Sequence, residues 1–193
     1  MRSARCFLIV ILRTDWSDED LRIQNMGIET VTYSLGESTL GMVLVARRSR
    51  GICAILFGDS EEALRDDLTR RFKAAPVLRD DMAMAADCNQ VMDLIETPAG
   101  RDALTLDPIG TAFQRRVWCA LREIPSGATA SYADIAKRID APKAARAVAG
   151  ACAANPIAVA IPCHRVVRGD GVLSGYRWGV ARKRALLARE GAL

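Results

Sequence analysis

The stretch Asn155–Arg165 reads Asn-Pro-Ile-Ala-Val-Ala-Ile-Pro-Cys-His-Arg and joins an apolar run to two reactive side chains. The run Ile157–Ile161 is long enough for one buried strand that ends at Pro162. Cys163 and His164 would then lie where a core strand reaches the surface. His164 is the only histidine among 193 residues, so it is the one imidazole available for acid–base chemistry near neutral pH.

Cys163 is followed directly by His164 and Arg165. The thiolate is the nucleophilic form of cysteine, and a nearby positive charge or a general base favours its formation. Neighbouring side chains on a regular strand point to opposite faces, so we expect a water molecule to relay the proton from Cys163 to His164. The alternative is a structural pair, because cysteine is often a small buried apolar side chain.

A histidine base usually needs a carboxylate to orient it. Glu190 ends a predicted last helix, Val180–Glu190, where the helix dipole disfavours a negative charge, so a compensating partner is expected. His164 is the candidate partner, although Glu190 could instead be a solvated terminal residue. Asn155 precedes a proline at a predicted helix end, and could be a plain cap or could fix the backbone of the reactive turn.

Charge divides the chain unevenly. Residues 1–110 carry 13 Lys and Arg against 18 Asp and Glu, a balance of −5, whereas residues 111–193 carry 14 against 5, a balance of +9. Such a dense positive segment is suited to neutralise the phosphates of nucleic acid. On charge alone, an acidic protein or a membrane surface is an alternative partner.

The acidic part predicts a small α/β module with no constellation of chemical groups, and we assign it a scaffold role. Its expected helices are one capped by Ser60 that runs through Phe72 and one at Asp81–Glu96. A break follows at Thr97–Gly100. Its expected strands are Glu29–Leu35, Gly41–Ala46, Gly51–Phe57 and Asp102–Leu106.

The basic part predicts helices instead. Thr111 caps a helix at Ala112–Glu123, Ser131 caps a helix at Tyr132–Ile139, and a third helix runs over Ala141–Ala154. Two helices joined by a short turn are typical of DNA-binding helix-turn-helix units, although many such pairs serve only for packing.

The third of these helices carries Arg146 as its only long polar side chain between Ala144 and Ala154. It therefore cannot read bases through the usual major-groove hydrogen bonds. A slim Ala/Gly helix could instead approach the narrow minor groove, where Arg146 could fill the space of a displaced base. The alternative is that the small residues pack against another helix.

Six widely spaced cysteines without a Cys-x-x-Cys pair, and a single histidine, predict free thiols in a reducing cytoplasm, no metal and no cofactor. The apolar run Cys6–Leu12 resembles a very short signal core. It lacks a small-residue cleavage site and is too short to cross a membrane, so we expect a buried strand or an irregular start of the chain.

Five motifs in residues 111–187 resemble the O6-alkylguanine-DNA alkyltransferases (methylated-DNA–protein-cysteine methyltransferases), and are closest to the C-terminal repair domain of their Ada-type members. The resemblance extends more weakly back to Gly27, through Arg50–Ala54, and residues 1–26 stay unassigned. The motifs are Ile161–Val167, Ser131-Tyr132, Arg146–Val148, Ala154–Pro156 and Gly175–Gly179.

This resemblance implies a ribonuclease-H-like α/β domain over residues 27–108 and a helical, winged-helix-like DNA-binding domain over residues 109–193. It also implies DNA repair by direct reversal. One methyl group would move irreversibly from guanine O6, or more slowly from thymine O4, to Cys163 of a monomer bound to double-stranded DNA. The nucleotide would flip out through the minor groove, because its O6 atom is inaccessible in the stack.

Residue roles follow by matching position. His164 would take the thiol proton through water, and Glu190 would orient the imidazole of His164. Asn155 would hold the backbone of the reactive turn. Tyr132 would help to rotate the nucleotide and would donate a proton toward guanine N3. Tyr132 could otherwise be a core aromatic side chain. The implied DNA contacts are Arg146, Ala147, Ser131 and Lys143. The implied base pocket comprises Leu173, Ser174, Tyr176 and Trp178; Trp178 replaces the glycine of some relatives, which predicts a tighter pocket that accepts benzyl groups poorly.

Two rival functions remain at this stage. An alkyltransferase-like DNA-binding module would lack the acceptor thiol, which is present here as Cys163. A thiol hydrolase using Cys163 and His164 would turn over, whereas an alkyltransferase is consumed mole for mole. The cysteine-rich sensor domain of full Ada proteins is not found in these 193 residues.

Overall fold

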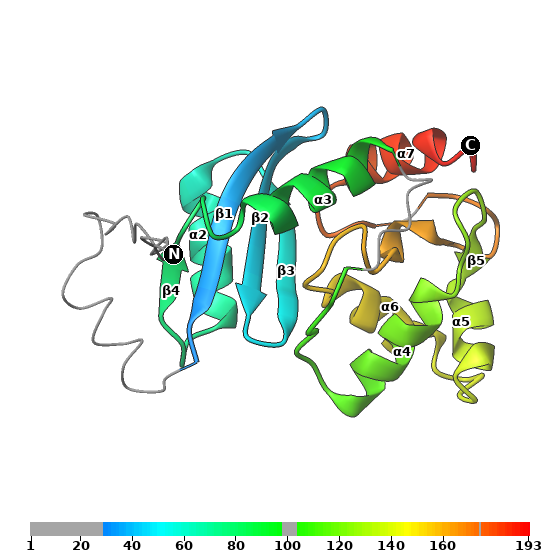
Figure 1. Cartoon of the computed structure of the whole chain (residues 1–193). Helices are drawn as coiled ribbons and strands as arrows, with labels where there is room; N and C mark the ends of the chain where they lie inside the picture. Colours follow the sequence, from blue (N-terminus) through cyan, green and yellow to red (C-terminus); the bar gives the residue numbers. More distant parts are fainter. Residues whose placement is uncertain (1–28, 98–103, 174) are drawn as a thin grey trace, which may run out of the picture.

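The computed structural model describes residues 29–97, 104–173 and 175–193, which form an α/β module beside a helical module (Figure 1). We call residues 29–108 the first module and residues 109–193 the second. The segment Cys6–Leu12 and Ser174 lie outside the described residues, and so does part of the strand expected at Asp102–Leu106.

The first module is built on a four-stranded mixed sheet in the order β3-β2-β1-β4. The first three strands expected from the sequence are present as β1 (Val31–Ser38), β2 (Gly41–Arg48) and β3 (Gly51–Gly58), and they form an antiparallel meander. The sequence analysis missed β4 (Val77–Arg79), which pairs parallel to β1, because three residues are too few to show a period.

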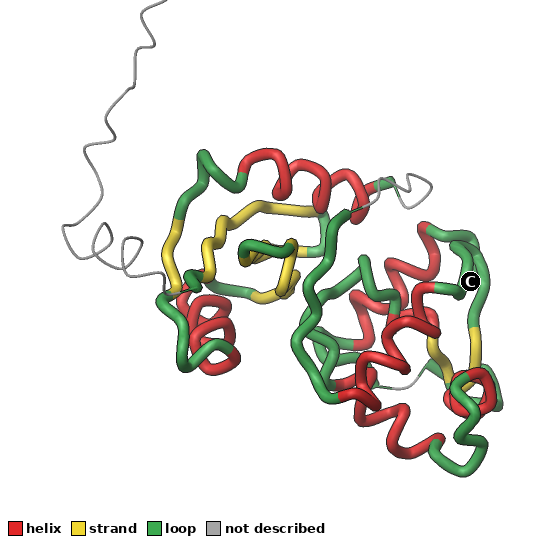
Figure 2. The backbone as a smooth tube through the Cα atoms, turned by 60° about the horizontal axis from the view of Figure 1, so that its bottom comes forward, coloured by secondary structure: helices red, strands yellow, loops and turns green. Residues whose placement is uncertain are grey.

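Two helices cover opposite faces of this sheet (Figures 1 and 2). Helix α2 (Glu61–Arg71) begins at the predicted cap, where the Ser60 hydroxyl accepts a hydrogen bond from the Ala63 amide at 3.2 Å. Helix α3 (Ala85–Glu96) begins four residues later than predicted, because Asp80 accepts from the Ala83 amide and holds a turn before it. With both faces covered, β3 is buried along nearly its whole length.

The outer edge of β3 connects the two modules. Ile52 exchanges backbone hydrogen bonds with Thr105 and Asp107, and Ile55 does so with Pro156 and Ala158. Gly51 permits the first contact, since a Cβ atom there would lie 2.5 Å from the Thr105 carbonyl oxygen. The edge that would otherwise be exposed is thereby paired.

The second module contains the three predicted helices, with one altered start. They are α4 (Ala112–Arg122), α5 (Tyr132–Arg138) and α6 (Ala145–Ala153). Thr111 and Ser131 each form a complete capping box. Helix α6 starts four residues after the predicted Ala141, because residues 141–144 form a turn instead.

Two short strands, a 3₁₀ turn and a last helix complete the described part of the second module. Strands β5 (Ala130–Ser131) and β6 (Val166–Val167) pair in parallel, and the reactive turn is a 3₁₀ helix, η1 (Cys163–Arg165). The last helix, α7 (Val180–Arg189), packs against η1. One continuous cluster of buried apolar side chains runs through both modules.

The strand predicted at Ile157–Ile161 is wrong. Ile157 makes a single bridge to Ile55, and the chain then turns, with Val159 in the left-handed region at φ 63°. A β-branched residue there is strained. The Asn155 side chain imposes the turn, because it bonds to the backbone of both Ile157 and Ile161.

Candidate active site

Cys163 lies at the start of η1 and is 4% exposed. Asn155, fully buried, directs its amide nitrogen at three acceptors: the Ile157 oxygen (3.2 Å), the Ile161 oxygen (2.8 Å) and the Cys163 Sγ (3.2 Å). Its own oxygen accepts from the Ile157 amide at 2.9 Å. One side chain therefore fixes the loop and points a donor at the sulfur.

The predicted pair of His164 and Glu190 is brought together. His164 Nε2 lies 3.0 Å from Glu190 Oε1, and both side chains are almost completely buried. The sequence analysis missed the role of Arg165, whose guanidinium donates to both oxygens of Glu190 at 2.9 and 2.8 Å. This cation is the compensation expected for a carboxylate at a helix C-terminus.

The titration of these groups follows from burial and charge. Burial raises the pKa of Cys163 to about 11, against the opposing effects of the Asn155 hydrogen bond and the Lys183 charge. Burial lowers the pKa of His164 below 6.5, although Glu190 acts in the opposite direction. Burial alone would raise the pKa of Glu190, but the bonds from His164 and Arg165 bring it down to about 2. At neutral pH the site thus holds a thiol, a neutral imidazole and a carboxylate.

Two buried polar atoms near the thiol make no hydrogen bond within the described part of the chain. They are His164 Nδ1 and the Tyr176 hydroxyl. The two rings meet edge to face with centroids 6.5 Å apart. Unsatisfied buried groups are rare in folded proteins, and here they are adjacent to the candidate nucleophile.

A pocket of about 370 Å³ opens beside Cys163. Tyr132 from α5 lines it. Three small side chains of α6, Ala149, Cys152 and Ala153, form one wall, and we call the segment 175–177, which also lines the pocket, its rim. Of the residues expected at the base pocket, Tyr176 is there, as is the predicted catalytic Tyr132.

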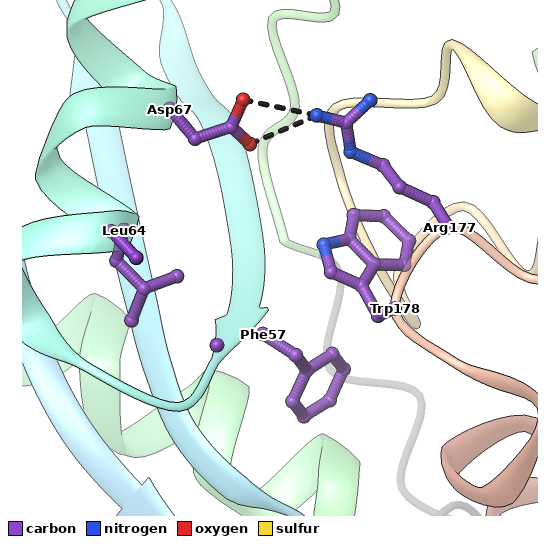
Figure 3. Close-up of a pocket in the computed structure, with 7 residues that line it drawn as sticks. Phe57, Leu64, Asp67, Arg177 and Trp178 are labelled. Carbon is purple, nitrogen blue, oxygen red and sulfur yellow. Dashed lines mark hydrogen bonds and ion pairs between the residues drawn. The ribbon is translucent and has the colours of Figure 1, made fainter.

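Trp178 and Leu173 are not among the residues that line this pocket. Trp178 lies in a second pocket with Phe57 and Leu64 of the first module (Figure 3). Its ring meets Phe57 edge-on at 6.3 Å and Tyr176 at 5.2 Å. The expectation that Trp178 directly narrows the base pocket therefore loses its geometric basis.

Three of the predicted DNA-contacting residues lie at or just before the start of α6, and the fourth, Ser131, lies at the start of α5. Lys143, Arg146 and Ala147 are exposed, and the half-buried Ser131 begins α5. Ser131 is already engaged in its capping box: its hydroxyl donates to Asp134 Oδ2 at 2.6 Å. Lys143 and Arg146 form no ion pair with any residue that the structure describes, which leaves their charges available to an external anion.

Lys183 was also missed by the sequence analysis. It is fully buried, and its ammonium group donates to the Val166 carbonyl oxygen. Its spacing could have revealed it, since Lys183, Leu186, Leu187 and Glu190 share one face of the helix. Within the described ranges, no group of three or more His, Cys, Asp or Glu side chains is arranged to hold a metal ion.

The chain is similar in sequence to known proteins. The model of the 6-O-methylguanine DNA methyltransferase DNA-binding domain matches residues 112–192. The bifunctional transcriptional activator/DNA repair enzyme Ada of Escherichia coli K12 is 52% identical over 160 residues, which are 83% of this chain and 45% of that protein. The chain thus spans about half the length of the curated relatives that it matches.

Solved structures cover the fold more fully. The Mycobacterium tuberculosis O6-methylguanine methyltransferase superposes with a TM-score of 0.71 at 35% identity, over 84% of this chain and 93% of that one. The M. tuberculosis OGT in complex with DNA gives 0.71 at 35% identity, over 83% and 92%. The chain belongs to the O6-methylguanine-DNA methyltransferase family.

Proposed function

We propose that this protein repairs double-stranded DNA by moving an alkyl group from O6 of guanine to its own Cys163, once per molecule. The observation that carries the proposal is Cys163 itself: a buried thiol on a pocket, held by Asn155 and adjacent to the His164–Glu190 pair. Family membership and the DNA complex of the M. tuberculosis relative support it.

The transfer needs a thiolate from a group whose pKa is about 11. His164 takes the thiol proton as the alkyl group moves, and Glu190 holds the imidazole and stabilises its charge. A water molecule that bonds to His164 Nδ1 completes the path from Cys163. The new bond joins Sγ to the alkyl carbon, the carbon–O6 bond breaks, and its electron pair stays on the guanine. Tyr132 donates a proton to guanine N3, and the proton that His164 took from the thiol returns through solvent to restore the tyrosine hydroxyl and the neutral imidazole.

The target base must leave the duplex to reach the pocket. The α6 surface suits a minor-groove approach, because Ala147 and Gly150 are exposed and small. We propose that Arg146 takes the place of the flipped nucleotide and that Lys143 and Ser131 contact phosphates. O4-methylthymine is the proposed slower substrate.

The finer fold assignments belong to the same proposal. The mixed sheet with helices on both faces supports a ribonuclease-H-like first module, and three helices beside the β5–β6 pair support a winged-helix-like second module.

The described part of the chain contains no helix that is long and apolar enough to cross a membrane. We propose a monomer that acts in the cytoplasm; the five described cysteines are free thiols, which suits a reducing compartment.

Duplex DNA with a labelled O6-methylguanine tests the proposal. We expect the label to move to the protein to a limit of one per molecule, on the peptide that contains Cys163. Cys163→Ala should transfer nothing and still bind duplex DNA, since a buried thiol is not a phosphate contact. Cys152→Ala is the matched control, because Cys152 lines the same pocket, and it should still reach one label per molecule.

Each rival function predicts a different result. A thiol hydrolase would release label with continued turnover, and a DNA-binding module without chemistry would leave the label on the DNA. Label on Cys152, or any transfer by Cys163→Ala, would also contradict the assigned acceptor.

A further inference from the structure

The rim of the Cys163 pocket is anchored outside its own module. Arg177 lines the pocket beside Cys163 and also the pocket beside α2. From there its Nη2 atom reaches both oxygens of Asp67, each at 3.0 Å (Figure 3). A helix of the first module thus holds one wall of the candidate active site.

Trp178 provides a second anchor next to the first. Its indole is 6% exposed, packs edge-on against Phe57 of β3, and contacts Tyr176, which in turn meets His164. The Trp178 carbonyl oxygen also accepts from Arg182 at 3.0 Å.

Arg182, which donates to the Trp178 carbonyl oxygen, also binds residues of the first module. Its guanidinium bonds to Asp59 at 2.6 Å and to the Leu40 carbonyl oxygen at 2.8 Å, and it lies over the Phe57 ring. The loop that leads to Cys163 has its own attachment to the first module, since Ile55 exchanges backbone hydrogen bonds with Pro156 and Ala158 beside Asn155.

We propose that the first module sets the geometry of the alkyl-acceptor pocket, with Asp67 as the positioning residue that holds the rim segment 175–178 through Arg177. The scaffold role assigned from the sequence is then incomplete, because Asp67 of α2 acts on the site through its ion pair with Arg177. Only the kinetic part of the test rests on the proposed function.

The charges around Asp67 make its ion pair with Arg177 sensitive to the sign of the residue at position 67. Arg71 and Arg70 of the same helix lie 3.4 and 3.7 Å from its carboxylate, so one acidic group offsets three cations. Asp67→Arg would put a fourth cation there and repel Arg177. Asp67→Arg combined with Arg177→Asp restores an attractive pair, because the carboxylate introduced on the rim would then face cations on α2.

Hydrogen exchange of peptides that cover residues 175–179 measures the rim directly. Removing a partly exposed ion pair in Asp67→Asn should speed this exchange about threefold to fivefold. Asp67→Arg should speed it about tenfold or more, since repulsion is added, and the double exchange variant should return to within about twofold of the parent protein. Asp66→Arg is the matched control, because Asp66 is exposed and has no ion pair in the described chain.

The transfer reaction gives the second readout. Asp67→Arg should raise the half-saturating concentration of O6-methylguanine duplex for single-turnover transfer, while affinity for undamaged duplex stays unchanged. The double variant is compared by hydrogen exchange alone, because Arg177 lines the Cys163 pocket. Unchanged exchange in Asp67→Arg, an equal effect of Asp66→Arg, or no recovery of the exchange rate in the double variant overturns the inference. If the parent protein transfers no label, the proposed function fails, and the exchange experiment still decides the role of Asp67.

Discussion

The two modules bury polar groups for different purposes. Among the described residues of the first module, Ser34 and Asp80 are buried and polar, and Asp80 holds a backbone turn. In the described part of the second module, Asn155, His164 and Lys183 are buried around Cys163, and the side chain of Glu190 is buried against His164. Burying a polar group is costly unless it is paired, so concentrating such groups at one point indicates a site built for chemistry rather than for stability.

The backbone shows the same contrast. The strands of the first module keep their pairing register apart from one shift between Ala46 and Arg47, whereas the path to Cys163 includes a left-handed valine and a 3₁₀ turn. Strained backbone persists only where its surroundings hold it, and here Asn155 does so.

The largest effect is expected from Glu190→Gln. At pH 7 the transfer rate should fall about 100-fold or more, because the imidazole loses the carboxylate that orients it and stabilises its charge. The pH profile gives a sharper test. With the pKa of His164 below 6.5, the parent rate should be flat between about pH 7 and 9. In the variant the rate should rise with pH toward the Cys163 pKa of about 11.

Glu190→Gln should also change how the free energy of unfolding depends on pH. A carboxylate whose pKa is lowered from 4.5 to about 2 stabilises the fold above pH 4.5, and this contribution is lost as the pH falls toward 2. Acid unfolding of Glu190→Gln should lack this component. A parent rate that climbs steadily between pH 7 and 9 would show that the thiolate forms without His164 as base.

A smaller effect is expected from Arg146→Ala. Repair should slow about 10-fold, because the space of the flipped base is left unfilled, while affinity for duplex DNA falls by less than about threefold. Lys143→Ala is the control, because Lys143 is exposed just before α6 and its loss should lower affinity and repair together. Single-turnover rates and gel-shift affinities measure both, and parallel losses in Arg146→Ala would make it an ordinary phosphate contact.

Local patterns in the sequence predicted local structure well. Short-range rules predicted the first three strands and the helix caps Ser60, Thr111 and Ser131. The family motif predicted that Cys163, His164 and Glu190 lie together. The strand at Ile157–Ile161 failed because a buried apolar run does not reveal that the Asn155 side chain will replace sheet hydrogen bonds. Trp178 lies beside Phe57 and not in the base pocket, and Asp67 pairs with Arg177. Both arrangements depend on contacts between the two modules, which no local sequence pattern encodes.

The smallest effect compares two helix caps, one in each module. Ser60→Ala and Ser131→Ala each remove a hydroxyl that accepts an amide hydrogen bond, at 3.2 and 3.1 Å, so each should cost about 1 kcal/mol in the free energy of unfolding. Urea titrations measure that cost. Only Ser131→Ala should also weaken duplex DNA binding, by about twofold to threefold, because α5 begins at the proposed interface. Equal DNA affinities in the two variants would confine Ser131 to its capping role and remove it from the proposed DNA contacts.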